Sequence, residues 1–559
     1  MPHLTKAIYA QLTAEDSPGF DTVVIGSGLS GLTTAAILAK GAGERVLVVE
    51  RHTALGGVTH ESERGLEFDT GLYAVGGKVW NSGPTRRVFD YISDKRIEWA
   101  RLDDVYDVAI VDGARFPIRA GADMFKLDLV KWFPGSEAAI TAYFKDVEAM
   151  TAKFQGLVVN QIASGWVPKS WIRVDVAFGD ETVDDALTRL GCVDKQLRQV
   201  LTYMHSAYGA LSASEASWVQ HCATVSHFLE GAAYPVGGPA SIAQAVVPVI
   251  ESRGGRCLTM ATAVAILVEK GRACGVVLKG HGLVKARKVV SAVGAYSTFV
   301  TLVPEEVSQQ IPDLWRARKG LEKDEPPSTS ARAMAFVAFK GSQRDLGLPA
   351  ANVWINSSEP GAFASVLIAF PSCKDPNWQA QHPSTSICEI VVDVTFPDYA
   401  QWTDDDGVKT TKPHEHQRAV KAAMTERMLN VMYEHFPALK DKVDFFESSV
   451  ALSSGHATAA SRKALGYALK PTPARYRAAA DWLKPATALP GLYLAGQDVV
   501  SCGVLGSLVG ALCCASAAST LGAAASRPHA VLFLFASDPP AGAPPRSIIP
   551  VAGLPSESI

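Results

Sequence analysis

The chain has 559 residues, 48% of them hydrophobic, and this length exceeds what a single compact core supports. Its 53 Lys and Arg residues nearly balance 56 Asp and Glu residues, so the formal net charge is −3 and no nucleic-acid partner is expected. The nine cysteines include no C-x-x-C pair, which argues against a metal site or a disulfide framework and favours a reducing compartment. We therefore expect a globular protein of two or more lobes.

The first predicted unit is a strand, a helix and a second strand near the N-terminus. Thr22–Ile25 is apolar and β-branched, Leu29–Leu38 has Ala, Thr and Leu at helical spacing, and Arg45–Glu50 is again strand-like. This order implies two parallel strands joined by a right-handed crossover, as in a Rossmann-like domain.

A glycine-rich turn joins the first strand to the helix. The first glycine permits the tight turn, the second lets backbone approach a pyrophosphate, and the third lets helix and strand pack closely. The unpaired N–H groups at the helix N-terminus would bind the phosphates. Glu50 follows the third glycine by 19 residues and can accept hydrogen bonds from the adenosine ribose. The turn consists of Gly26, Ser27, Gly28, Leu29, Ser30 and Gly31.

Two further segments indicate that the dinucleotide is FAD rather than NAD. Arg51 follows Glu50 directly, and Gly56 and Gly57 come shortly after, so that backbone can approach the flavin phosphates there. Val264 lies in a predicted strand that resembles the strand whose backbone meets the adenine in flavoproteins.

A third segment returns to the flavin late in the chain. A short apolar strand ends at Gly496 and Asp498, and Asp498 would hold the ribityl hydroxyls. Gly503, Val504 and Leu505 then open a helix whose N-terminal dipole would stabilise negative charge on the reduced ring. The sequence has no second glycine-rich unit of this kind. We therefore expect FAD as the cofactor, with NAD(P)H as a candidate reductant that has no dedicated binding domain.

These motifs resemble those of the carotenoid and retinoid oxidoreductase family, which comprises phytoene desaturases, carotenoid cis–trans isomerases and all-trans-retinol 13,14-reductases. The similarity extends over residues 20–521. The middle segments are most similar to the 13,14-reductase, or retinol saturase, branch. The segments that carry it are GLEFDTG at 65–71, YPVGG at 234–238, AFPS at 369–372 and LAGQDVVSCGVLGSLVGA at 494–511.

The resemblance implies an α/β fold: a Rossmann-like FAD-binding domain of the GR2-type flavoproteins, with an inserted mixed α+β substrate and cover domain. We expect the FAD-binding domain to be assembled from three separate parts of the chain. The predicted division is an N-terminal extension at 1–19, FAD-binding parts at 20–77, 234–300 and 486–526, a mostly helical cover at 78–233, a substrate domain with antiparallel strands at 301–485, and a Pro-rich, disordered tail at 527–559.

The resemblance also implies an apolar polyene substrate, a retinoid or carotenoid, held beside the flavin, with saturation of a C=C bond as the reaction. Carotenoid desaturation or cis–trans isomerisation, oxidation of an amine or another apolar compound, and a non-enzymatic flavin-binding role are the alternatives. The electron donor stays open. His60 and Tyr73, close in sequence to the flavin loops, are the candidate proton donors, and His205 and Tyr208 are secondary candidates.

Membrane contact is the last expectation. Residues 499–526 carry no charge and are numerous enough to span a bilayer, but their Gly, Ala, Ser and Cys content predicts a buried helix instead. Residues 1–20 lack the apolar run of a signal peptide. We expect a protein on the cytoplasmic side, peripherally associated with a membrane through aromatic side chains of the cover. These are Trp132, Phe133, Trp166 and Trp171.

Overall fold

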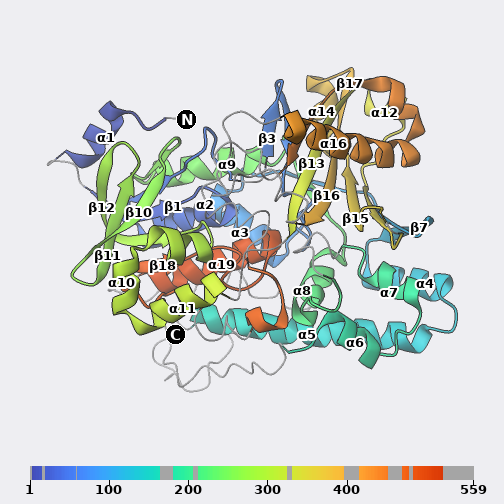
Figure 1. Ribbon diagram of the computed structural model, residues 1–559, viewed down its shortest axis with the longest axis horizontal. Coiled ribbons are helices and arrows are strands. Elements are labelled where there is room, and N and C mark those ends of the chain that lie inside the picture. The colour runs from blue at the N-terminus through green and yellow to red at the C-terminus, as the bar shows by residue number, and fades with distance from the viewer. Residues whose placement is uncertain are drawn as a thin grey trace.

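The protein is built on two large β-sheets that lie side by side, with helices packed around and beneath them (Figure 1). In Figure 1 the first sheet is on the left, the second is at the upper right, and a row of helices lies below the second. The computed structural model describes residues 3–14, 19–57, 60–163, 180–204, 212–323, 330–359, 361–395, 415–450, 469–476 and 483–519.

The first sheet has the strand order β10-β11-β12-β1-β2-β9, and β18 pairs with the end of β12. Strands β2, β1, β12 and β18 run parallel, whereas β10 and β11 form an antiparallel extension at one edge. The predicted strand–helix–strand unit and the late return of the chain are therefore both present. The strands are β1 Phe20–Ile25, β2 Val46–Val49, β9 Arg256–Leu258, β10 Ala263–Glu269, β11 Arg272–Leu278, β12 Gly282–Ser291 and β18 Leu492–Leu494.

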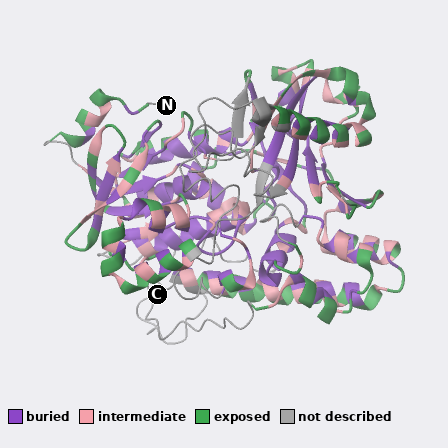
Figure 2. Ribbon diagram, viewed as in Figure 1, coloured by how far each residue is buried: buried purple, intermediate pink, exposed green. Residues whose placement is uncertain are grey.

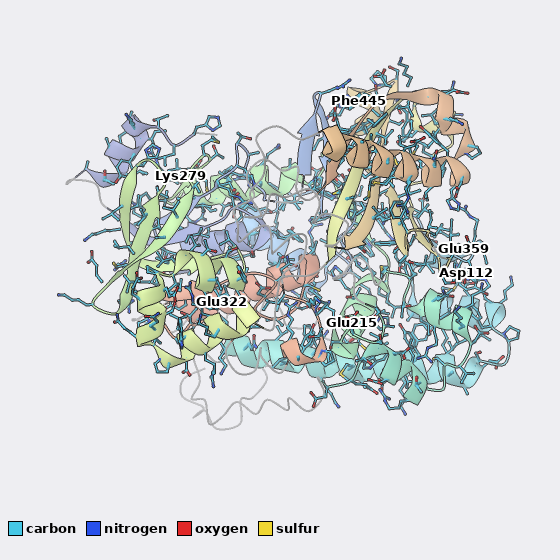
Figure 3. The ribbon with its side chains drawn as sticks, viewed as in Figure 1. Asp112, Glu215, Lys279, Glu322, Glu359 and Phe445 are labelled. Atoms are coloured by element: carbon cyan, nitrogen blue, oxygen red, sulfur yellow. The ribbon has the colours of Figure 1, made fainter. Side chains whose placement is uncertain are left out.

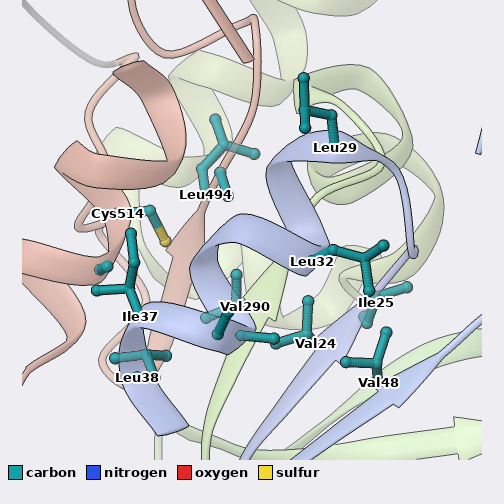
Figure 4. Close-up of a cluster of buried hydrophobic side chains, with 14 of the residues drawn as sticks. Val24, Ile25, Leu29, Leu32, Ile37, Leu38, Val48, Val290, Leu494 and Cys514 are labelled. Carbon is teal, nitrogen blue, oxygen red and sulfur yellow. The ribbon is translucent and has the colours of Figure 1, made fainter. Parts of the chain in front are cut away.

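Helices α2 and α19 form the centre of this lobe. Helix α2 (Leu29–Ile37) continues into the π-helix η1 (Leu38–Ala42), and α19 (Gly503–Ala518) packs against it. Figure 4 shows Ile37 of α2 beside Cys514 of α19, whereas Leu32 of α2 lies next to Ile25 of the sheet. Small side chains permit this close packing: a Cβ on Gly510 of α19 would lie 2.1 Å from the carbonyl oxygen of Gly496.

The uncharged segment near the C-terminus thus contributes a buried helix, as predicted. Within the described ranges, no helix combines the length and the apolar character needed to cross a bilayer. Helices α3 (Pro84–Ser93) and α9 (Ala240–Glu251) also pack on α2.

The second sheet has the order β17-β13-β16-β15-β14-β6-β7 and is antiparallel except between β14 and β6. Helix α16 (Glu415–His435) covers one face and buries Met428 and Met432 there. Antiparallel strands were predicted for this region, but β14 and β17 were not. The strands are β6 Val105–Val111, β7 Ala114–Arg119, β13 Ser330–Lys340, β14 Asn352–Asn356, β15 Ser365–Ala369, β16 Thr385–Thr395 and β17 Val443–Val450.

The cover region differs from its prediction in one respect. Residues 99–119 form strands rather than helices, and two of these strands complete the second sheet. Buried and exposed side chains alternate along β7, and this alternation fits a strand with one face in the core better than it fits a helix. The other elements here are β5 Trp99–Arg101, α4 Ala122–Trp132, α5 Glu137–Ala163, α6 Val183–Arg189, α7 Lys195–Leu201, α8 Trp218–Phe228 and β8 Ala233–Pro235.

The expected aromatic surface patch is wrong for the two members that the structure describes. Phe133 is buried and stacks on Phe116, with ring centroids 5.7 Å apart. Trp132 is half-buried and packs edge-on against the same ring. Both side chains pack in the core of the cover region, because Phe116 offers them an apolar partner there. Trp166 and Trp171 lie outside the described residues.

Burial follows the two sheets, which are purple along most of their length in Figure 2. Charged side chains such as Asp112, Glu215, Lys279 and Glu359, labelled in Figure 3, are exposed. The remaining elements are α1 Lys6–Thr13, β3 His60–Glu63, β4 Leu66–Asp69, η5 Ser297–Leu302, α10 Glu305–Gln310, α11 Pro312–Lys323, α12 Gln343–Leu346, α13 Pro371–Lys374, α14 Trp378–Gln381 and η6 Pro437–Lys442.

Candidate cofactor cradle and active-site cleft

The glycine-rich turn between β1 and α2 has the geometry of a phosphate cradle. Gly26 has φ +96°, which favours glycine, and a Cβ on Gly31 would lie 2.0 Å from the carbonyl oxygen of Gly26. Gly28 precedes the first residue of α2, and no side chain caps that end of the helix. A Cβ on Gly28 would meet no protein atom within 4 Å, so the backbone there is open to an approaching ligand.

Glu50 lies at the end of β2, beside this turn, and is buried. Its Oε2 accepts hydrogen bonds from the Ser27 N–H at 2.9 Å and from the Ser27 hydroxyl at 2.7 Å. Its Oε1 lies 3.0 Å from the donating N–H of His52 and 2.7 Å from Nδ1 of the same residue. Burial raises the pKa of Glu50, but these hydrogen bonds outweigh it and hold the pKa at about 2. The carboxylate is therefore charged at neutral pH.

The second glycine pair lies directly against the first turn. Gly56 forms a parallel bridge with Gly28, and its N–H donates to the Ser27 hydroxyl oxygen at 3.2 Å. Gly57 has φ +71°, and a Cβ there would lie 2.8 Å from the Cα of Gly28. The structure thus brings together two segments that the sequence separates, as the FAD prediction requires.

The predicted adenine strand also reaches this end of the sheet. The N–H of Ala261 donates to the carbonyl oxygen of Glu50 at 2.7 Å, so the chain enters β10 alongside Glu50. Val264, near the start of β10, is 43% exposed and therefore accessible to a ligand. Arg51, directly after Glu50, is half-buried.

Asp498 and Gly496 meet the cradle from the C-terminal side. A Cβ on Gly496 would lie 3.2 Å from the Ser30 hydroxyl oxygen in α2. Asp498 is buried, and its two oxygens accept hydrogen bonds from the N–H groups of Ala295 (2.6 Å) and Leu469 (2.8 Å). Asp498 therefore fixes the loop after β12. Its contact with ribityl hydroxyls stays a prediction.

Two glutamines that sequence reasoning missed position the start of α19. Gln220 of α8 accepts hydrogen bonds through Oε1 from the hydroxyls of Ser501 (3.0 Å) and Tyr476 (2.6 Å) and from the N–H of Cys502 (3.3 Å). Gln497 accepts from the N–H of Gly503 at 2.9 Å. Gly503, Val504 and Leu505 then form the first turn of the helix.

A cleft of about 550 Å³ opens where α19 begins and the second sheet ends. Most of its wall is apolar or aromatic, with a small polar group at one side. The lining residues are Gly71, Tyr73, Ala74, Tyr106, Asp107, Met204, Phe228, Ala232, Asn352, Trp354, Gly503 and Val504. A second, smaller cleft shares Met204 with it and is lined by α8 residues, including Gln220.

Of the predicted proton donors that the structure describes, one lines this cleft. Tyr73 does, and it is buried. His60 lies in β3, where its backbone is opposite Asp69 of β4. His205 and Tyr208 lie outside the described residues.

A buried polar network underlies the polar side of the cleft. Asp107 accepts hydrogen bonds from the Asn352 amide (2.9 Å) and the Tyr203 hydroxyl (2.9 Å). Lys374 donates to Asn352 Oδ1 at 2.6 Å and to the carbonyl oxygen of Tyr73 at 2.8 Å. Burial raises the pKa of Asp107 to about 6, and it lowers the pKa of Lys374.

The same network continues through Asp69 and Glu389. The Tyr234 hydroxyl donates to Asp69 at 2.6 Å, and the N–H of Asp69 donates to Glu389. Burial raises the pKa of both carboxyl groups. A sequence signal existed for Asp107, because it is the one acid inside the otherwise apolar strand β6.

Residues 24–94 match a family model described as an NAD(P)-binding Rossmann-like domain. The chain is 32% identical over 531 residues to the all-trans-retinol 13,14-reductase of Rattus norvegicus, covering 89% of this chain and 85% of the rat protein. The chain belongs to the all-trans-retinol 13,14-reductase family. This membership confirms the family resemblance and the oxidoreductase class predicted from the sequence.

The chain is also similar to a more distant relative and to a solved structure. It is 30% identical over 316 residues to a neurosporene-forming phytoene desaturase of Cereibacter sphaeroides, covering 51% of this chain and 56% of the desaturase. Its fold matches the crystal structure of an oxidoreductase from Methanosarcina mazei with a TM-score of 0.58 at 17% identity, covering 88% of this chain and 99% of the other. The predicted α/β fold with a dinucleotide-binding domain is confirmed.

Proposed function

We propose that this protein is an FAD-dependent oxidoreductase that saturates a C=C bond of an apolar polyene, with the 13,14 bond of all-trans-retinol as the first substrate to test. One observation carries the proposal. A dinucleotide cradle and an apolar cleft meet at the start of α19, in a chain that is 32% identical over most of its length to a protein named for this reaction.

The described residues fit FAD. The uncapped start of α2 beside Gly28 would receive the pyrophosphate, and the charged Glu50 would receive the adenosine ribose. Ser27 and His52 now occupy the Glu50 oxygens, so they would share this carboxylate with the ribose hydroxyls. Asp498 and the first turn of α19 lie at the far end of the cradle, toward the cleft, where the flavin ring would lie. The bound flavin would supply the hydride.

The protein's own contribution is to bind, orient and shield the substrate. Ala74, Met204, Phe228 and Trp354 give the cleft an apolar wall that suits a polyene and excludes water. The polar side of the cleft lies near Asp107, where a terminal hydroxyl or a transferred proton can be accommodated.

Peripheral membrane contact is part of the proposal because a retinoid or carotenoid must be collected from a bilayer or a carrier. The aromatic pair Trp132 and Phe133 does not supply that surface. On the same helix, α4, Met124 is 40% exposed and Leu127 is 62% exposed, three residues apart and therefore on one face. We assign the membrane contact to this face of α4, with the cytoplasmic leaflet as its partner.

Two measurements test the function. Acid precipitation of purified protein should release non-covalently bound FAD to the supernatant, whereas a protein without flavin would refute the proposal. Anaerobic incubation of the reduced holoprotein with all-trans-retinol should yield a product that has gained two hydrogen atoms. If retinol is untouched and a carotenoid is desaturated or isomerised instead, the alternative function, carotenoid desaturase or isomerase, holds. The similarity to a phytoene desaturase favours that alternative.

A further inference from the structure

A buried carboxyl group faces the proposed reaction space from the second sheet. Asp107, in the middle of β6, is 2% exposed and lines the cleft. Gly503 and Val504 at the start of α19 line the same cleft. An acid and the helix end that would border the flavin ring therefore open onto one space, although more than 390 residues separate them in the sequence.

The surroundings of Asp107 fix its orientation. Asn352 donates to Oδ1 and Tyr203 donates to Oδ2, each at 2.9 Å. Lys374 holds Asn352 in place through a 2.6 Å hydrogen bond to its Oδ1, which leaves the Asn352 amide nitrogen directed at Asp107. A carboxyl oxygen has room for a second hydrogen bond, so these partners orient the group without closing it to a substrate.

The charged and titratable groups around Asp107 allow its carboxyl group both to hold a proton and to release it. Lys374 is the nearby cation, and it also faces Asp69 and Glu389, which share its charge. Tyr106 on the same strand and Tyr203 after α7 are the other titratable neighbours. Burial raises the pKa of Asp107 to about 6, against the lowering effect of the hydrogen bonds from Asn352 and Tyr203. A general acid is most effective when its pKa lies near the working pH.

We propose that Asp107 is the catalytic acid of this cleft, which delivers a proton to one carbon of the substrate double bond while hydride reaches the other. This rests on the proposed function. The π bond is replaced by two C–H bonds: one hydrogen arrives as hydride with both electrons from reduced flavin, which is thereby oxidised, and the other arrives as the proton of the Asp107 carboxyl group. Asp107 is left as a carboxylate and regains its proton from solvent. Asn352, Lys374 and Tyr203 are positioning residues.

The test compares Asp107→Asn with Tyr73→Phe, because Tyr73 is the other proton-bearing side chain predicted for this cleft. Asn keeps the size of Asp and can still pair with Tyr203 and Asn352, so folding should survive. Reduced holoprotein is mixed with all-trans-retinol and flavin reoxidation is followed in a single turnover. Asp107→Asn should slow this step by about 10²–10⁴-fold, with flavin content and retinol binding, measured by tryptophan fluorescence quenching, unchanged. Tyr73→Phe should slow this step less than Asp107→Asn does.

Tyr203→Phe supplies a second arm. Loss of the Tyr203 hydroxyl removes a hydrogen bond that favours the Asp107 carboxylate, so the pKa of Asp107 should rise further. In the wild type, the rate should fall as the pH rises through about 6, and in Tyr203→Phe this fall should move to higher pH. A merely structural role would lower the rate equally at every pH.

A readout independent of turnover completes the test. The infrared band of a protonated carboxyl group, followed in wild-type protein as the pH is raised through about 6, should contain a component that is missing in Asp107→Asn. An identical band in both proteins, or wild-type flavin reoxidation in Asp107→Asn, would overturn the proposal. If the wild-type protein binds no flavin or reduces no polyene, the proposed function is overturned together with the role of Asp107, and this result is obtained before any variant is compared.

Discussion

The side chain of Gln220 in α8 accepts a 3.0 Å hydrogen bond from the hydroxyl of Ser501, just before α19 begins. The same oxygen also accepts from Tyr476 and from the N–H of Cys502, so one amide of the cover region positions the helix end at which the cleft and the cradle meet. The geometry of the candidate site therefore depends on contacts between domains, in addition to the dinucleotide motif.

Gln220→Leu should destabilise this junction. It would remove the Gln220 oxygen that accepts from Tyr476, Ser501 and Cys502, at a cost of about 1–3 kcal/mol for each buried donor left unsatisfied. Urea unfolding should show the loss, and flavin content after purification should fall. Gln220→Glu keeps the acceptor oxygen and should behave nearly as wild type. Gln309→Leu, at an exposed site, is the matched control and should change neither quantity. Wild-type stability in Gln220→Leu would show that this junction is unimportant.

Two glycines of the first turn, Gly28 and Gly31, should respond differently to substitution. Gly31→Ala should lower the melting temperature, because its Cβ would overlap the backbone oxygen of Gly26. Gly28→Val should leave folding nearly intact and abolish flavin binding, because its side chain would extend into the open space in which the pyrophosphate is expected. Gly156→Ala in α5 has room for a methyl group and should be neutral or slightly stabilising. Full flavin occupancy in Gly28→Val would show that this turn is not the phosphate cradle.

The stability of the protein should depend on the ionisation of Asp107. Its pKa is raised from 3.8 to about 6 in the folded state, so its protonation stabilises the fold at low pH, and that contribution is lost as the pH rises through about 6. Between about pH 4 and pH 7 the wild type should therefore lose about 2 kcal/mol of unfolding free energy relative to Asp107→Asn. Denaturant unfolding of both proteins across this range measures the difference. Parallel pH curves would contradict the assignment.

Membrane association can be tested by liposome flotation. Protein mixed with anionic vesicles should float, and the double variant Met124→Ser with Leu127→Ser should remain at the bottom of the gradient because it removes the exposed apolar face of α4. Phe446→Ser, at another exposed apolar site on β17, is the control and should float like wild type. Wild-type protein that stays at the bottom with every lipid mixture would point to delivery of the substrate by a soluble carrier.

The sequence predicted the geometry of the glycine-rich turn far better than that of the cleft. The geometry of a local pattern such as the turn at Gly26–Gly31 can be predicted from the sequence, because each glycine meets a requirement of the backbone at its own position. The bridge between Gly28 and Gly56 was not predicted from the sequence; it forms because both segments follow strands that end at the same edge of the sheet.

The acid at Asp107 was missed because its role arises from tertiary contacts. Its partners Tyr203, Asn352 and Lys374 come from separate elements, and no spacing in the sequence relates them. The misread stretch at 99–119 had the same cause, since β6 joins a sheet whose neighbouring strand β14 lies more than 200 residues later. A single acid within an apolar strand was the available signal.

The most direct test of the central claim is an anaerobic half-reaction. Holoprotein is reduced chemically, freed of excess reductant and mixed with all-trans-retinol, and the flavin and polyene absorbances are followed together. We predict that oxidised flavin reappears in step with the loss of polyene absorbance, one flavin for each double bond saturated. A flavin that stays reduced in the presence of retinol, and likewise with a carotenoid, would contradict the account.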